Sequence, residues 1–157
     1  MNVLIIGGGS SLSEEFIKKI GRKIDQLHVT ARETSGLSFD KTISSVSKYE
    51  LDFKNRETIK EFFGKKFKSS YFDLILFISS PFEGTLSSSS YDDLDIWGNA
   101  YDVSLKVAKL ASVSLKESGK LIYIGSIVGY QGKIAASCVP YSVFKGSLSL
   151  LVEGFVK

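Results

Sequence analysis

The sequence has very few of the residues that build metal sites, disulfides and histidine-based active sites. Among its 157 residues there are one cysteine, Cys138, one histidine, His28, and two prolines. A single cysteine excludes an intrachain disulfide, which fits a reducing compartment. One cysteine and one histidine are too few ligands for a typical zinc site. We therefore expect neither a bound metal nor a histidine-based triad. His28 itself lies inside a strand-like run, so we expect it to be packed or hydrogen-bonded.

Long apolar runs and strong net charge are also missing. No apolar stretch approaches the roughly 18 residues that indicate a membrane span. The chain starts directly in a strand-like run, without the basic region of a signal peptide. The net charge is only +3, and the basic cluster of Lys65, Lys66 and Lys68 is more simply a solvated helix end than a nucleic-acid surface. We therefore expect a soluble cytoplasmic protein that binds neither nucleic acid nor a membrane.

What the chain does have is an alternation of short apolar runs and amphipathic stretches. With 43% hydrophobic residues it can bury a core, and its length predicts one domain, 1–157. The predicted strands are Asn2–Ile6, Gln26–Arg32, Tyr49–Phe53, Asp73–Ser79 and Leu121–Ile124. Helices are predicted from Leu12, after an N-cap at Asn55, over Asp92–Glu117, and from Tyr141 onward. This alternation predicts a Rossmann-like, doubly wound parallel sheet of order 3-2-1-4-5 in a three-layer α/β/α fold.

A glycine-rich turn follows the first predicted strand at once. Its sequence is Gly7-Gly8-Gly9-Ser10-Ser11-Leu12-Ser13, and the next predicted helix begins inside it. A strand, a glycine-rich turn and a helix N-terminus together present backbone N–H groups to a phosphate. The same sequence is also compatible with a plain tight turn, because serines stand where a dinucleotide fingerprint has its later glycines.

The second predicted strand ends in Ala31-Arg32. A dinucleotide with a free ribose 2′-hydroxyl calls for an acidic residue at this point, and a 2′-phosphate calls for an arginine. Arg32 would give that phosphate a fork of charged donors. The alternative is an arginine that is merely exposed at a strand end.

Three polar residues follow the fifth predicted strand. Ser126 comes directly after it, while Tyr141 and Lys145 are four residues apart and share a face of the last predicted helix. A neighbouring ammonium favours the phenolate form of a tyrosine, and Ser126 would hold a substrate oxygen beside the phenol. An isolated Tyr-x-x-x-Lys is more often structural, so its context decides the interpretation.

The helices predicted at 92–117 and 141–156 are apolar on too many sides for a surface helix. A helix that is apolar on most sides must be buried on most sides. The sheet covers only one side, so we expect a homodimer or homotetramer to form through these two helices.

These residues together resemble the short-chain dehydrogenase/reductase family over the whole chain. Gly7 matches the first glycine of the family motif, and Ser126, Tyr141 and Lys145 match its catalytic serine, tyrosine and lysine. The chain departs from the family at three places: Ser11 and Ser13 replace the later glycines, Phe77-Ile78-Ser79-Ser80 replaces its Asn-Asn-Ala-Gly, and Ser104 takes the position of its catalytic asparagine. The resemblance implies that NADP(H) is preferred over NAD(H). It also implies cofactor contacts from Gly7, Gly9, Ser10, Ser11, Leu12, Ala31, Arg32, Asp52, Phe53, Ser79, Ser80, Tyr141 and Lys145.

The resemblance further implies a reaction, hydride transfer between nicotinamide and a small carbonyl or alcohol substrate. Tyr141 would be the acid/base, Lys145 would assist it, Ser126 would orient the carbonyl oxygen, and Ser104 would stand in for the asparagine. Family members are usually longer and add two strands, so we expect either a fragment or a naturally short chain. Two alternatives stay open: a nucleotide-binding or scaffold protein without turnover, and a nucleotide-sugar epimerase or dehydratase.

Overall fold

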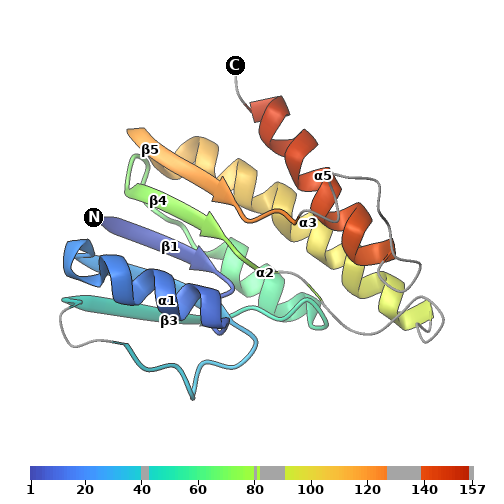
Figure 1. The fold of residues 1–157 in the computed structure, drawn as a ribbon, viewed down its shortest axis with the longest axis horizontal. Coiled ribbons are helices and arrows are strands. Elements are labelled where there is room, and N and C mark those ends of the chain that lie inside the picture. Colours follow the sequence, from blue (N-terminus) through green and yellow to red (C-terminus); the bar gives the residue numbers. More distant parts are fainter. Residues whose placement is uncertain (40–42, 80, 82–90, 127–138, 156–157) are drawn as a thin grey trace.

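The chain folds around one parallel sheet in a computed structural model that describes residues 1–39, 43–79, 81, 91–126 and 139–155 (Figure 1). The strand order within these residues is β3-β2-β1-β4-β5, which confirms the predicted order. The strands are β1 (Asn2–Ile6), β2 (Gln26–Ala31), β3 (Ser45–Glu50), β4 (Phe72–Phe77) and β5 (Leu115–Tyr123). The helices are α1 (Ser11–Ile20), the 3-10 helix η1 (Gly21–Lys23), α2 (Arg56–Gly64), α3 (Tyr91–Ser114) and α5 (Val139–Phe155).

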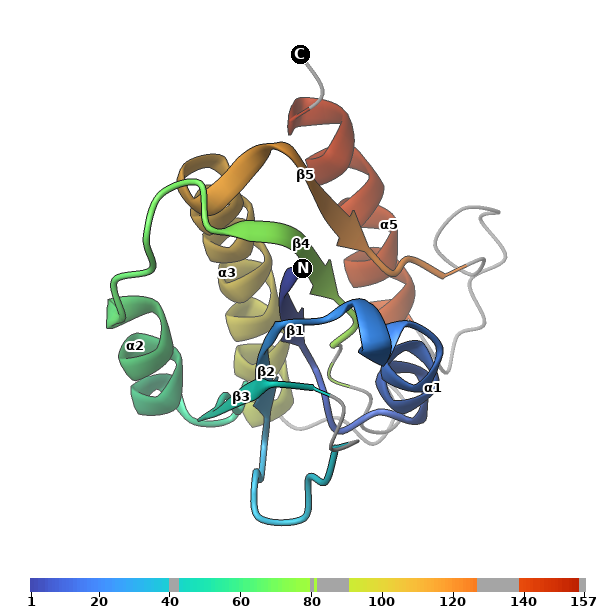
Figure 2. The same ribbon diagram turned by 90° about the vertical axis from the view of Figure 1, so that its left-hand side faces the viewer.

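The central strand β1 is buried on both faces, and its side chains alternate between two cores. Val3 and Ile5 pack with Ile17 of α1, whereas Leu4 and Ile6 belong to a core shared with α2, α3 and α5. These four side chains of β1 are all fully buried. This is why the strand has an unbroken apolar run instead of a polar/apolar alternation. Figure 2 shows α1 on the opposite side of the sheet from α2 and α3, which confirms the three-layer arrangement.

Helices α3 and α5 lie side by side on one face of the sheet (Figure 1). Trp97 of α3 and Phe144 of α5 have ring centroids 5.9 Å apart, and Phe144 is completely buried. Leu148, one turn further along α5, belongs to the same core. These contacts fix α5 next to the end of β5.

No helix in the described ranges is long and apolar enough to cross a membrane.

The third strand lies earlier in the sequence than predicted. We expected Tyr49–Phe53, and the structure has β3 at Ser45–Glu50, paired in parallel with β2. β3 is an edge strand of the described sheet, and none of its six side chains is fully buried. The sequence therefore has no apolar run at Ser45, Ser47 and Lys48. The apolar residues just after the strand moved the predicted strand too far along the chain.

The long helix is shorter than predicted, because its last three expected residues belong to the next strand. The predicted helix ran over Asp92–Glu117, whereas α3 ends at Ser114 and β5 begins at Leu115. Leu115 pairs with Phe72 of β4, and a register shift follows before the regular pairing resumes. Gly119 permits this close approach, because a Cβ there would lie 2.9 Å from the Phe72 carbonyl oxygen.

Candidate functional site

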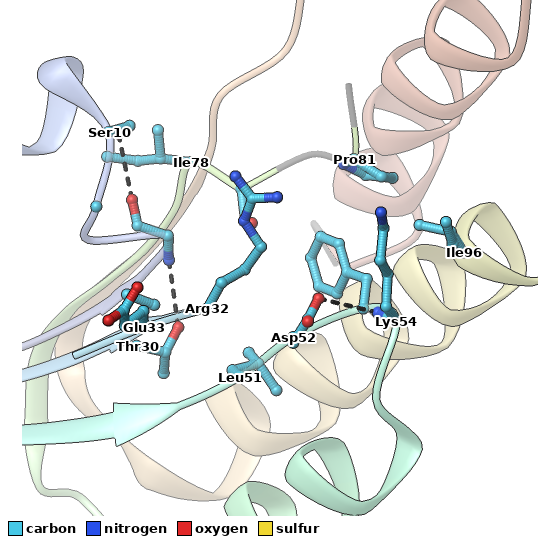
Figure 3. Close-up of a pocket in the computed structure, with 15 residues that line it drawn as sticks. Ser10, Thr30, Arg32, Glu33, Leu51, Asp52, Lys54, Ile78, Pro81 and Ile96 are labelled. Atoms are coloured by element: carbon cyan, nitrogen blue, oxygen red, sulfur yellow. Dashed lines mark hydrogen bonds between the residues drawn. The ribbon is translucent and has the colours of Figure 1, made fainter. Parts of the chain in front are cut away.

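A cavity of about 720 Å³ opens at the carboxyl ends of β1, β2, β3 and β4 (Figure 3). Parallel α/β sheets bind ligands at this edge, where the strand order reverses. Eight of the predicted cofactor contacts line it: Gly7, Gly9, Ser10, Ala31, Arg32, Asp52, Phe53 and Ser79. Seven further residues line it without having been predicted: Thr30, Glu33, Leu51, Lys54, Ile78, Pro81 and Ile96.

The glycine turn is held in place by the neighbouring strands. The amides of Gly7 and Gly8 both donate to the Thr30 carbonyl, at 3.2 and 2.7 Å. Gly7 has a φ of 102°, and a Cβ there would lie 2.8 Å from the Ser79 amide nitrogen. A Cβ on Gly8 would lie 1.8 Å from Cγ2 of Val29. Glycine is therefore required at both positions. At Gly7 the reason is the backbone conformation, and at Gly8 it is the packing of the turn on β2.

Two of the serines in the turn stabilise its backbone. Ser10 is the N-cap of α1, and its hydroxyl accepts from the Ser13 amide at 3.2 Å. Ser13 is fully buried, and its hydroxyl lies 2.6 Å from the carbonyls of Gly8 and Ser10. A serine thus replaces the third glycine of the family motif without leaving a buried polar atom unpaired. Ser11 and Leu12 are exposed in the first turn of α1 and do not line the cavity.

The end of β2 carries a basic side chain into the cavity. Ala31 is buried under the sheet edge, and Arg32 is exposed and extends into the cavity (Figure 3). The next residue, Glu33, has an oxygen that accepts from the Ser35 hydroxyl at 2.7 Å. The arginine lines the cavity at the end of β2, in the position predicted from the sequence.

The turn between β3 and α2 forms the other wall of the cavity. An Asp52 carboxylate oxygen accepts from the Lys54 amide, and the Asp52 amide donates to the Thr58 hydroxyl, both at 3.0 Å. The Asn99 side chain of α3 donates to the Phe53 carbonyl at 2.6 Å. The prediction found Asp52 and Phe53, but not Lys54 or Asn99. A lysine two residues after a strand has no distinctive sequence pattern, and Asn99 is recognisable only from the tertiary contact.

Lys145 is a buried cation next to the end of β5. Its side chain is 2% exposed, and Nζ donates to the Ile124 carbonyl at 2.8 Å. Burial lowers the pKa of Lys145 from 10.5 to about 8. Nζ lies 5.9 Å from the ring centroid of Tyr141, so the two residues are neighbours on α5 as predicted. Ser126 is half-buried and follows Ile124 by two residues.

The position that the family gives to an asparagine has a different environment here. Ser104 is buried, and its hydroxyl donates to the Tyr101 carbonyl of the same helix at 2.7 Å. The Ser104 carbonyl accepts from the Tyr123 hydroxyl of β5, also at 2.7 Å. Burial raises the pKa of Tyr123, so this phenol is a stable donor between α3 and β5. In this arrangement the Ser104 hydroxyl bonds to the backbone of its own helix.

Apart from Ser11, Leu12 and Ser104, the predicted residues thus fall into two groups within the described chain. One group lines the cavity, and the other, formed by Ser126, Tyr141 and Lys145, lies at β5 and α5 and does not line it. Ser80, a predicted cofactor contact, lies outside the described residues, as does the 127–138 segment that joins the two parts of the second group.

No protein-family model matches the sequence, and no curated protein matches it significantly. Solved structures do match the fold. A short-chain dehydrogenase from Burkholderia cenocepacia J2315, in complex with NADP, has a TM-score of 0.75 at 17% identity, covering 98% of this chain and 66% of its own. A bulky-bulky ketone specific alcohol dehydrogenase from Comamonas testosteroni has a TM-score of 0.73 at 17% identity, with the same coverage.

An NADH-dependent reductase complexed with NAD matches with a TM-score of 0.69 at 13% identity, covering 99% of this chain and 71% of its own. This chain therefore spans about two thirds of the length of the structures it resembles. Identities this low establish the fold alone. The chain adopts the Rossmann-like fold of the short-chain dehydrogenases/reductases.

Proposed function

We propose that this chain is an NADP(H)-dependent oxidoreductase of the short-chain dehydrogenase/reductase type, acting on a small carbonyl or alcohol substrate. The observation that carries the proposal is the pairing of Tyr141 with the buried ammonium of Lys145, beside the end of β5. Burying a lysine is costly, and one hydrogen bond to Ile124 offsets that cost only in part. Residues whose pKa is strongly shifted by burial cluster at functional sites.

The cavity residues fit the adenosine and phosphate part of a dinucleotide. Backbone N–H groups in the first turn of a helix have no acceptor within that helix, and here this turn lies beside Gly9 and Ser10 of the cavity. Arg32 would bind a 2′-phosphate, and the carboxylate of Asp52 would accept from the amino group of an adenine. The preference for NADP(H) over NAD(H) rests on Arg32 and on the absence of an aspartate or glutamate at the end of β2, where the chain has Ala31-Arg32.

When bound, the nicotinamide would supply or accept a hydride at the substrate carbon. Tyr141 would donate a proton to the forming alkoxide, or remove it in the reverse direction. The Lys145 ammonium would stabilise negative charge on that phenol, and Ser126 would hold the carbonyl oxygen. With a pKa of about 8, Lys145 would carry its charge at neutral pH and lose it progressively in mildly alkaline solution.

The cofactor proposal is tested by titrating NADPH and NADH into the protein by calorimetry. We expect NADPH to bind more tightly than NADH, and we expect Arg32→Ala to remove most of that difference while leaving NADH binding nearly unchanged. Lys23→Ala, which removes a cation from η1 outside the cavity, is the control. If neither nucleotide binds at millimolar concentration, the proposal is wrong.

A second candidate is a dinucleotide-binding protein without turnover. The observation in its favour is Ser104, whose hydroxyl bonds to the Tyr101 carbonyl and not to a group in the cavity. Tight NADPH binding combined with no oxidation of NADPH by a panel of aldehydes and ketones would support this candidate over the first.

The exposed side of α5 supports the proposed self-association. Val143 and Leu150 are seven residues apart, which places them on one side of the helix, and they are 51% and 69% exposed. Leu105 of the adjacent helix α3 is 57% exposed. We propose a homodimer or homotetramer through α3 and α5. Light scattering at micromolar concentration should detect it, and Leu150→Glu should yield a monomer.

A further inference from the structure

Arg56 is the first residue of α2, and helix stability does not account for a cation at this place. The N-terminus of a helix carries a partial positive charge, so an arginine in the first turn is unfavourable for α2 itself. Its guanidinium lies 3.9 Å from the Asp95 carboxylate of α3, but both side chains are mostly exposed, so this ion pair contributes little. The contact that indicates a role is the hydrogen bond from Arg56 to Asn99 of α3.

This hydrogen bond orients the side-chain amide of Asn99. Nε of Arg56 donates to Oδ1 of Asn99 at 3.2 Å, and Nδ2 of Asn99 donates to the Phe53 carbonyl at 2.6 Å. An amide has its acceptor on one side and its donors on the other, so a donor held at Oδ1 leaves Nδ2 for the carbonyl. In the reversed orientation two oxygens would face each other at Phe53. Because Asn99 is only 9% exposed, few water molecules can compete for its amide.

The carbonyl held by Asn99 belongs to the turn between β3 and α2, which forms a wall of the cavity described above. Phe53 and its neighbours Asp52 and Lys54 all line that cavity, and Figure 3 shows the hydrogen bond from the Lys54 amide to Asp52 within the turn. A second cavity of about 570 Å³ adjoins the first, and Arg56 and Asn99 line it. Where cavities adjoin a turn, fewer side chains pack against it, so its position depends more on hydrogen bonds.

We propose that Arg56 is a positioning residue for the adenosine half of the cofactor, which acts through Asn99 on the wall of the cavity. The proposal rests on the cofactor class given above. Arg56 lines the second cavity and not the first, so it would act without touching the nucleotide. Its removal would let the Asn99 amide turn, loosen the Phe53 carbonyl and lower the affinity for a nucleotide whose adenine lies against Asp52.

The test compares Arg56→Met with Lys60→Met, which removes the same charge from the next turn of α2 and lines neither cavity. Binding of ADP, a nicotinamide-free probe, is measured by calorimetry. We expect Arg56→Met to weaken it by about fivefold, as for the loss of one hydrogen bond, and Lys60→Met to change it by less than about twofold. Hydrogen exchange of the Lys54 and Asn55 backbone amides, which both donate to Asp52, should become faster in Arg56→Met only.

A double-mutant cycle decides whether Arg56 acts through Asn99. In the Asn99→Ala background, Arg56→Met should cause no further loss of ADP affinity, because the amide that it orients is gone. A loss as large as in the parent background would mean that Arg56 acts on the nucleotide through its charge, and the inference would be overturned. Equal effects of Arg56→Met and Lys60→Met on affinity and exchange would also overturn it.

Two further outcomes separate this inference from a structural role and from the cofactor proposal. A lower free energy of unfolding in Arg56→Met with unchanged ADP affinity would assign the arginine to stability alone and overturn the inference. Failure of ADP to bind the parent protein would overturn the cofactor proposal, while the exchange rates of the Lys54 and Asn55 amides would still decide whether Arg56 orders the turn.

Discussion

The cavity at β1–β3 and the Tyr141–Lys145 segment of α5 are constructed in different ways. The cavity is formed by backbone: a glycine turn bonded to Thr30 and a β3–α2 turn bonded to Asn99. The α5 segment depends on side chains, with a buried lysine whose ammonium donates to the Ile124 carbonyl. The cavity should therefore be sensitive to added volume, and the α5 segment to the removal of single functional groups.

The largest expected effect lies in the α5 segment. Tyr141→Phe removes the proposed proton donor, so kcat should fall by about 10²–10⁴-fold. NADPH affinity, measured by calorimetry, should change little, because phenylalanine removes only the hydroxyl, and the adenosine part of the cofactor is expected in the cavity, which Tyr141 does not line. Tyr101→Phe makes the same change on α3 and should leave kcat within about twofold of the parent. Equal turnover of Tyr141→Phe and the parent would remove the tyrosine from the mechanism.

The next effect tests the cavity by adding one methyl group. Gly8→Ala places a Cβ 1.8 Å from Val29 Cγ2, so the glycine turn or β2 must shift. We expect a loss of about 1–3 kcal/mol in the free energy of unfolding by urea, together with weaker NADPH binding. Gly9→Ala is the matched control for stability, because its Cβ would lie 3.7 Å from the Ala31 Cβ in ordinary contact. Equal urea midpoints for the two variants would contradict the packing argument.

A smaller effect should follow from loosening the wall of the cavity. Asn99→Ala leaves the Phe53 carbonyl without its 2.6 Å donor, which should cost about 1–2 kcal/mol in unfolding free energy. Nucleotide affinity should fall several-fold, because the turn that carries Asp52 and Lys54 becomes less ordered. Calorimetry and urea unfolding measure the two effects. Unchanged nucleotide affinity in a destabilised variant would show that the turn does not depend on this contact.

The smallest expected effect is the pH dependence of stability caused by Lys145. Its pKa is about 8 in the folded protein and 10.5 ordinarily, so between these values the unfolded chain binds more protons. Stability must then rise with pH in this window, by about 1 kcal/mol between pH 7.5 and 9.0. Lys145→Met should abolish that increment in urea unfolding measured at the two pH values. An identical pH dependence of the parent and the variant would mean that Lys145 is not desolvated.

The sequence by itself determined the strand order, the three layers and eight of the residues that line the cavity. Apolar runs such as Asn2–Ile6 and Asp73–Ser79 are strong signals, because a strand buried on both faces is almost continuously apolar. The same reasoning fails at the edges of the sheet. β3 and the start of β5 are partly exposed, so Ser45–Lys48 and Leu115–Glu117 could be assigned only from their pairing with β2 and β4.

The tertiary structure alone decided which residues meet. Gly7 and Arg32 are far apart in the sequence, and they line one cavity because β1 and β2 are neighbours in the sheet. Lys54 and Asn99 join the same wall through contacts that leave no periodic pattern. The low pKa of Lys145 also depends on the core that surrounds it, since burial and not sequence spacing desolvates the ammonium. The apolar pattern of a segment predicts a helix or strand, but the chemistry of a site depends on the side chains that other helices and strands place beside it.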